Sequence, residues 1–218
     1  MSWTKAAVVV LLMACTSELM AQEAAQEPFV DPIKLMANVQ AYYDDAKSFS
    51  GDFEQTYVTL DGIEKKSSGT VWFKKPGLMR WDYSTPEERY LISDGKTFWS
   101  WEPVYRQYCE QSLASSQLPT ALSFLVGEGS LQKEYLYWVS GSANGKHTMA
   151  LAPFVPSPHY TKLELIIEAE SNRVDGVVIY DAMGNLNTIQ FSKVEINGVM
   201  DEANFSFSPP EDAQEICK

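Results

Sequence analysis

Apolar residues recur along this chain with two different periods, and the change from one to the other falls near residue 49. The pair Asp31-Pro32 is typical of the N-cap and the first residue of a helix. Apolar side chains then follow at helical spacing, at Leu35, Met36, Val39 and Tyr43. This spacing predicts an amphipathic helix of about four turns.

From Phe49 onward the period is two, as in a strand with one buried face. The alternation is clearest where Met79, Trp81 and Tyr83 share one face and charged residues take the other. Asp-Gly, Pro-Gly and Asn-Gly pairs between such segments predict tight turns. The predicted strands cover residues 49–57, 70–74, 78–83, 90–93, 96–101, 105–110, 135–140, 147–152, 161–168, 174–180 and 186–195, with a short extended end at 205–207.

The alternation breaks once, where an apolar run at residues 118–126 is followed by Gly127. This pattern predicts a short helix that interrupts the sheet. The chain shows no βαβ spacing and no internal repeat. About eleven twisted strands joined by tight turns cannot stay flat. We therefore predict a mainly β (α+β) fold, a curled antiparallel sheet or open barrel.

The first 21 residues have the layout of a secretory signal peptide: one cation, an unbroken apolar run from Ala6 to Ala14, and a small residue before Gln22. We expect residues 22–30 to form a flexible spacer and residues 31–218 to form a single domain. A second interpretation stays open, because Leu12-Met13-Ala14-Cys15 loosely resembles a lipobox in which Cys15 would be acylated. We favour the cleaved leader because methionine fits the second position poorly.

Charge and composition change the picture in two ways. The 218 residues hold 17 Lys and Arg against 29 Asp and Glu, a net charge of -12. A nucleic-acid partner is disfavoured, because phosphate binding needs a basic surface. The chain also holds 6 Trp, 11 Tyr and 10 Phe, and some of these rings are candidates to line a cavity.

No sequence motif indicates an active site, a metal site or a cofactor site. There are 2 histidines, His147 and His159, and no HExxH, GxSxG, GxGxxG or Walker pattern. Neighbouring carboxylates such as Asp52 and Glu54 are better explained as solvated. Cys109 and Cys217 remain after the leader, and an even pair in an exported protein predicts a disulfide. The alternative is two unrelated thiols.

An ordered set of short motifs runs along the predicted strands. The set begins with Phe53-Glu54-Gln55 and ends with Pro209-Pro210, and so spans most of the mature chain. Its members are FEQ at 53–55, GTVWFKKPGLMRW at 69–81, SDGKTFW at 93–99, Pro103, Gln107 and FSFSPP at 205–210. Any one of these motifs is weak, but the ordered set is fairly specific. It resembles the family of periplasmic outer-membrane lipoprotein carriers, LolA.

The resemblance implies an unclosed antiparallel barrel covered by a short helical lid. It also implies a monomeric, non-enzymatic shuttle in the periplasm of a Gram-negative bacterium. Such a shuttle takes acylated lipoproteins from an inner-membrane ABC transporter. It shields their acyl chains and delivers them to the outer membrane or to a receptor there.

We expect this function to use three groups of residues. The candidate wall of an acyl-binding cavity is Phe53, Met79, Trp81, Tyr83, Trp99 and Trp101, and the candidate lid is Leu118, Pro119, Leu122 and Leu125. The family often has an arginine before the proline at position 76, where it latches the lid. Here that residue is Lys75, whose ammonium cannot reproduce the planar fork of arginine. A weaker or different latch is therefore expected.

Three other functions remain open from the sequence. One is a LolB-like outer-membrane receptor of the same fold, anchored through an acylated Cys15. Another is a general lipid carrier or an envelope-stress sensor built on a similar half-barrel. The last is an enzyme acting on lipids, which is disfavoured because no pair of nucleophile and base is visible.

Overall fold

The computed structural model describes residues 29–113 and 129–217. The expected leader, most of the expected spacer and the expected helix at 118–126 lie outside these residues. The predicted N-terminal helix is confirmed as α1 (Pro32–Asp45), with Leu35, Met36, Val39 and Tyr43 buried. Asp31 is its N-cap: Oδ1 accepts hydrogen bonds from the backbone N–H of Ile33 at 2.9 Å and of Lys34 at 3.4 Å.

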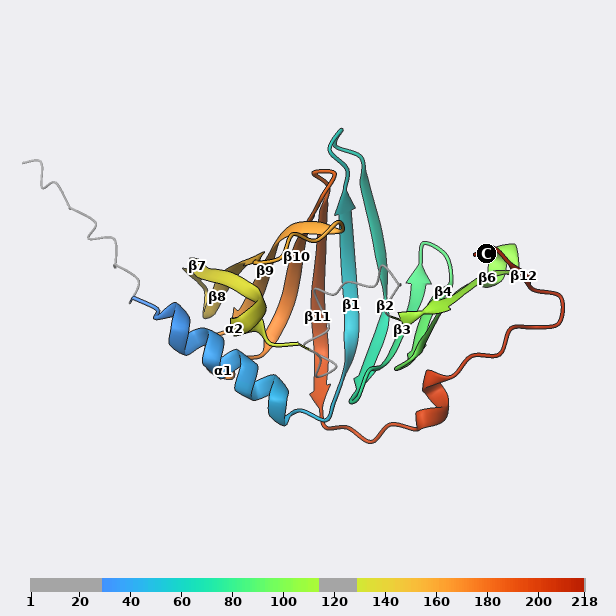
Figure 1. The fold of residues 1–218 in the computed structure, drawn as a ribbon, viewed down its shortest axis with the longest axis horizontal. Coiled ribbons are helices and arrows are strands. Elements are labelled where there is room, and N and C mark those ends of the chain that lie inside the picture. Colours follow the sequence, from blue (N-terminus) through green and yellow to red (C-terminus); the bar gives the residue numbers. More distant parts are fainter. Residues whose placement is uncertain (1–28, 114–128, 218) are drawn as a thin grey trace, which may run out of the picture.

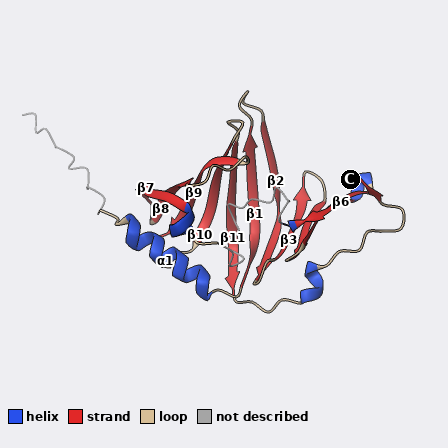
Figure 2. Cartoon of the chain, in the orientation of Figure 1, coloured by secondary structure: helices blue, strands red, loops and turns tan. Residues whose placement is uncertain are grey.

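The described strands form one sheet that curls without closing (Figures 1 and 2). They are β1 (Ser48–Val58), β2 (Glu64–Lys74), β3 (Leu78–Thr85), β4 (Arg89–Asp94), β5 (Thr97–Glu102), β6 (Gln107–Ser112), β7 (Tyr135–Ala143), β8 (Lys146–Pro153), β9 (Tyr160–Glu168), β10 (Val174–Asp181), β11 (Leu186–Ile196) and β12 (Gln214–Glu215). Their order is β12-β6-β5-β4-β3-β2-β1-β11-β10-β9-β8-β7. The unclosed, mainly β fold expected from the sequence is thus confirmed.

β1 lies in the middle of the sheet because it pairs with β2 on one side and with β11, from the far end of the chain, on the other. Adjacent strands in this order are antiparallel, except that β12 pairs parallel to β6. At Gly69 on β2, a Cβ would come within 1.9 Å of the carbonyl oxygen of Asp82 on β3. Only glycine allows the two strands to approach this closely.

Three short helical elements differ from the prediction. The segment expected to be extended at 205–207 contains the end of a 3-10 helix, η4 (Glu202–Phe205), because the Asp201 carboxylate caps the N–H of Ala203 at 3.0 Å. A one-turn helix, α2 (Leu131–Glu134), precedes β7. Its first N–H, that of Leu131, donates to Oε1 of Gln40 on α1 at 2.9 Å. A third element, the 3-10 turn η1 (Pro103–Tyr105), precedes β6.

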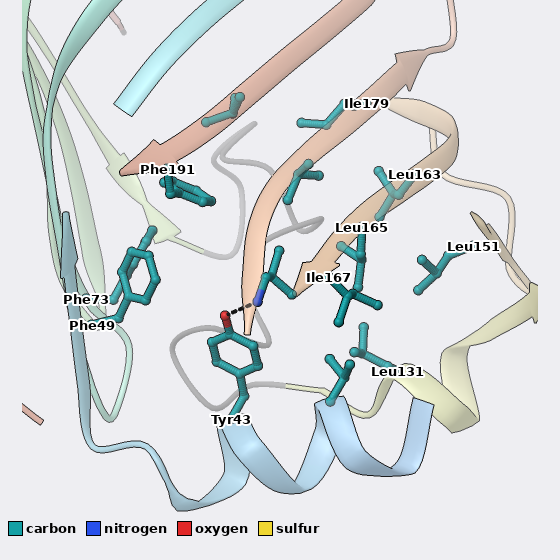
Figure 3. Packing of buried hydrophobic residues seen from close by; sticks show 14 of the residues in the cluster. Tyr43, Phe49, Phe73, Leu131, Leu151, Leu163, Leu165, Ile167, Ile179 and Phe191 are labelled. Carbon is teal, nitrogen blue, oxygen red and sulfur yellow. Dashed lines mark hydrogen bonds between the residues drawn. The ribbon is translucent and has the colours of Figure 1, made fainter. Parts of the chain in front are cut away.

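The core lies on the inner face of the curled sheet, which we define as the face that carries Phe53, Phe73 and Trp81. α1 packs at this face, and its last turn reaches both halves of the sheet (Figure 3). The hydroxyl of Tyr43 accepts a hydrogen bond from the N–H of Val174, the first residue of β10, at 3.0 Å. Burial raises the pKa of this hydroxyl above its ordinary value.

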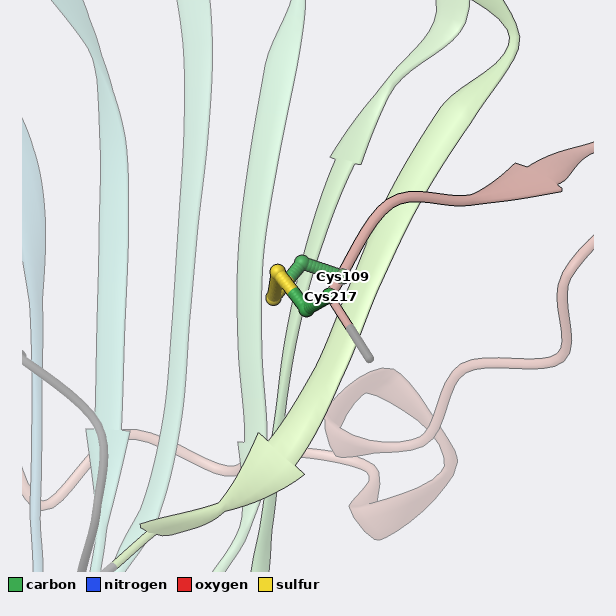
Figure 4. The surroundings of a disulfide bond; sticks show 2 residues. All are labelled: Cys109 and Cys217. Carbon is green, nitrogen blue, oxygen red and sulfur yellow. A yellow bond between two sulfur atoms is a disulfide. The ribbon is translucent and has the colours of Figure 1, made fainter.

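The C-terminal segment crosses the outer face of the sheet and ends at its edge. Phe205 is buried, and the Arg80 guanidinium of β3 donates to the carbonyl of Asn204 at 3.0 Å. Cys217 then forms a disulfide with Cys109 of β6, with the two Cα atoms 5.0 Å apart (Figure 4). The predicted pairing is confirmed. None of the described helices is both long enough and apolar enough to span a bilayer.

Tyr43→Phe tests the contact between α1 and the sheet. The change removes the acceptor and leaves the buried N–H of Val174 without its partner, which costs about 1–3 kcal/mol. We expect the free energy of unfolding, measured by urea titration, to fall by this amount. Tyr42→Phe on the same helix is the control, because Tyr42 is only half buried. Equal stability of Tyr43→Phe and wild type would contradict the importance of this hydrogen bond.

A double variant, Cys109→Ser/Cys217→Ser, tests the disulfide near the C-terminus. The disulfide joins residues 108 apart in sequence, and removing a link over such a loop costs about 2–5 kcal/mol. We expect a lower Tm by calorimetry and faster proteolysis after residue 205. Reducing agent should lower the Tm of wild type and leave that of the double variant unchanged. A similar Tm for wild type with and without reductant would disprove the prediction.

Candidate functional site

Aromatic rings from four neighbouring strands meet on the inner face. The Trp81 indole of β3 lies among Phe53 of β1, Phe73 of β2 and Phe191 of β11, with ring centroids 4.7, 5.7 and 6.3 Å away. Phe53 also meets Tyr83 edge-on at 4.9 Å. Such tilted and edge-to-face pairs form a broad apolar surface. This aromatic cluster is the candidate functional site.

The structure brings together four of the six residues expected in the wall. Phe53, Met79, Trp81 and Tyr83 all lie on the inner face, and between 1% and 8% of the surface of each is exposed. The pairing of β1, β2 and β3 brings them together. Met79 lies opposite Phe73, and Tyr83 lies opposite Gly69, which in turn lies opposite Phe53.

Trp99 and Trp101 do not join this group. On β5 they are paired with Ile92 and Tyr90, which are themselves paired with Arg80 and Asp82 on the outer side of β3. Residues directly opposite in an antiparallel pair share a face. The expectation that both tryptophans belong to the same wall as Trp81 is therefore corrected: Phe98, between Thr97 and Trp99, is a buried inner-face residue of β5.

Sequence reasoning also missed inner-face residues outside the best alternating segment. Phe49, Phe73, Phe98 and Phe191 are buried in the same core cluster as Trp81. Alternation placed Phe49 on the face of Phe53, which was a usable signal. For Phe98 and Phe191 the missing information was strand register, because register decides which face of a strand turns inward.

A polar band borders the aromatic cluster toward the β1–β2 turn. The Tyr83 hydroxyl donates to Oε1 of Gln55 at 3.1 Å, and Nε2 of Gln55 donates to Oδ1 of Asn187 at 2.9 Å. Burial raises the pKa of Tyr83. The Arg89 guanidinium, which lies 4.2 Å from the centroid of the Tyr83 ring, opposes this shift. The inner face thus changes from apolar to hydrogen-bonded along β1.

Lys75 lies at the β2–β3 turn and contacts the end of α1. Its ammonium donates to the backbone carbonyl of Tyr43 and, at 3.2 Å, to that of Asp44. A cation there satisfies carbonyls that the helix leaves open and interacts favourably with its dipole. The residue expected to latch a lid thus ties α1 to the sheet. The expected lid residues, Leu118, Pro119, Leu122 and Leu125, lie outside the described residues.

Trp101 has a different environment, on the outer face. Its ring lies 5.8 Å from that of Phe207 in the C-terminal segment. Together with Arg80, Tyr90 and Ser206, these rings line an open pocket of about 370 Å³. Within the described residues, no cluster of three or more His, Cys, Asp or Glu could hold a metal ion.

Comparison with known proteins identifies the family. Residues 44–208 match the family described as outer membrane lipoprotein carrier protein LolA. The chain belongs to the LolA family. An outer-membrane lipoprotein carrier protein of Chromohalobacter salexigens is 27% identical over 177 residues, which cover 81% of this chain and 83% of that protein. One of Alkalilimnicola ehrlichii is 29% identical, over 97% of this chain and 95% of its own length.

A solved structure shares the fold of this chain at low sequence identity. An uncharacterized conserved protein from Thermus thermophilus has a TM-score of 0.55 and 12% identity, over 85% of this chain and 98% of that chain. The match to the LolA family contains the aromatic cluster and Lys75, and ends before Cys217. The disulfide therefore joins a residue inside the family match to one beyond it.

Lys75→Met tests the link between the β2–β3 turn and α1 in this LolA-family chain. It keeps the apolar stem and removes the charge, and we expect a loss of about 1 kcal/mol in the free energy of unfolding. Lys75→Arg should restore most of the loss, because guanidinium also donates to carbonyls. Lys66→Met, at an exposed ion pair with Glu64, should change nothing measurable. If both methionine variants unfold like wild type, Lys75 does not stabilise α1.

Proposed function

We propose that this chain carries acylated lipoproteins through the periplasm to the outer membrane, with their acyl chains held on the inner face of the sheet. It would accept them from an inner-membrane ABC transporter and deliver them to the membrane or to a receptor. The chain is a carrier and not an enzyme, in keeping with its family and with relatives named as lipoprotein carriers. No cofactor is needed for this function.

The observation that carries the proposal is the aromatic cluster on an unclosed sheet. Each buried CH2 of an acyl chain is worth about 0.8 kcal/mol, so a soluble carrier needs a continuous apolar surface. Such a surface is formed by Phe53, Trp81 and Phe191, which lie on three different strands. Their flat rings contact a hydrocarbon chain without fixing its conformation. Because the sheet does not close, its two edges can move apart to admit cargo without breaking a ladder of hydrogen bonds between strands.

Met79→Glu tests the proposal. It puts a carboxylate on the inner face, where Met79 is 8% exposed, and a charge next to an acyl chain is strongly unfavourable. We expect the amount of lipoprotein recovered with the purified chain to fall by about tenfold or more. The measurement is intact mass spectrometry of the soluble complex isolated from the native envelope fraction.

Two control variants separate binding from folding. Met79→Leu conserves volume and should carry cargo like wild type. Ser84→Glu puts the same charge on an exposed position of the same strand and should also behave like wild type. Undiminished cargo in a folded Met79→Glu chain would contradict binding at this face. A mass showing lipidated Cys15 would point to the anchored receptor, and free lipid as cargo to a general lipid carrier.

A further inference from the structure

The aromatic cluster contains an unpaired hydrogen-bond donor. Among the buried side-chain nitrogen and oxygen atoms of the described residues, only Nε1 of Trp81 lacks a hydrogen-bond partner. The residue is 3% exposed. A buried donor without an acceptor is unfavourable, and the great majority of buried polar side-chain atoms are paired. This donor therefore calls for an explanation.

No described residue accepts a hydrogen bond from the Trp81 indole. The indole lies among Phe53, Phe73 and Phe191, with Tyr83 stacked beside it at 6.4 Å. Aromatic faces accept hydrogen bonds only weakly. The nearest polar band is already occupied by its own contacts, since Oε1 of Gln55 accepts from the Tyr83 hydroxyl.

The contrast with Trp99 shows that pairing an indole is easy on this sheet. On the outer face, Nε1 of Trp99 donates to the carboxylate of Glu110 at 3.0 Å. A phenylalanine at position 81 would keep an aromatic ring on the inner face without an unpaired donor. Trp81 thus adds to the apolar surface a group that only an incoming acceptor can satisfy.

We propose that the Trp81 indole N–H donates a hydrogen bond to the carbonyl oxygen of a bound acyl chain, in an ester or an amide. This inference rests on the proposed function and specifies its ligand. An indole N–H is a donor only, so the ligand must supply an acceptor. The apolar surroundings disfavour charged acceptors such as phosphate or carboxylate. An acyl carbonyl is uncharged and bonded directly to the hydrocarbon chain that the neighbouring rings contact.

The hydrogen bond gives the inner face a preference that hydrophobicity cannot give. Ethers with the same alkyl chains lack the carbonyl and are more apolar than esters. A purely hydrophobic surface would therefore bind the ether at least as tightly as the ester. The Trp81 hydrogen bond makes the ester bind more tightly than the ether. It also fixes how deeply the head of the lipid enters the inner face.

The experiment compares dioctanoylglycerol with the dioctyl ether of glycerol as competitors for an apolar fluorescent dye bound to the mature chain. We expect wild type to bind the ester about fivefold to tenfold more tightly than the ether, the effect of one buried hydrogen bond. Trp81→Phe should lose this preference through weaker ester binding and unchanged ether binding. Trp99→Phe, on the outer face, should keep it.

A second measurement needs only the folded wild type. In the NMR spectrum of indole-labelled protein, the ester should shift one tryptophan N–H signal downfield, and the ether should not. Equal binding of the two lipids by wild type, or a preference kept in Trp81→Phe, would overturn the inference while leaving acyl binding intact. Failure of both lipids to displace the dye would overturn the proposed function and this inference together.

Discussion

Tyr43 joins the two halves of this molecule through two of its own oxygen atoms. Its side-chain hydroxyl accepts a hydrogen bond from the N–H of Val174 at the start of β10. Its backbone carbonyl accepts one from the ammonium of Lys75 at the β2–β3 turn. β1 begins shortly afterwards, at Ser48. An open sheet has no ring of strands to fix its curvature, so contacts of this kind must do so. The placement of the inner face depends on this turn of helix.

The two faces of the sheet serve different purposes. On β3, the inner residues Met79, Trp81 and Tyr83 belong to the apolar core, while the outer Arg80 pairs with Asp82 and with the carbonyl of Asn204. The outer face thus holds the C-terminal segment by ordinary hydrogen bonds and ion pairs. Around Trp81 the inner face is apolar, and the hydrogen bonds nearby lie in the polar band of Tyr83, Gln55 and Asn187.

Local patterns were enough to predict the N-terminal helix, the meander of about eleven strands and the disulfide, because capping, alternation and cysteine number are properties of short segments. They also placed Met79, Trp81 and Tyr83 on one face. They failed for Trp99 and Trp101, since the facing of β5 depends on its pairing with β4. The contact of Lys75 with α1 could not be predicted from these patterns either, because its partners are backbone atoms of the helix.

The two ends of the sheet are unequal. At one end, β12 lies against β6 and the bond between Cys217 and Cys109 keeps it there. At the other end β7, from Tyr135 to Ala143, pairs with β8 on one side only in the described part of the chain. Growth of a filament by edge-to-edge addition requires two open edges on every subunit. Because β12 is only 2 residues long, the edge that it forms offers almost no ladder to a second chain, and edge-to-edge growth from that side is disfavoured.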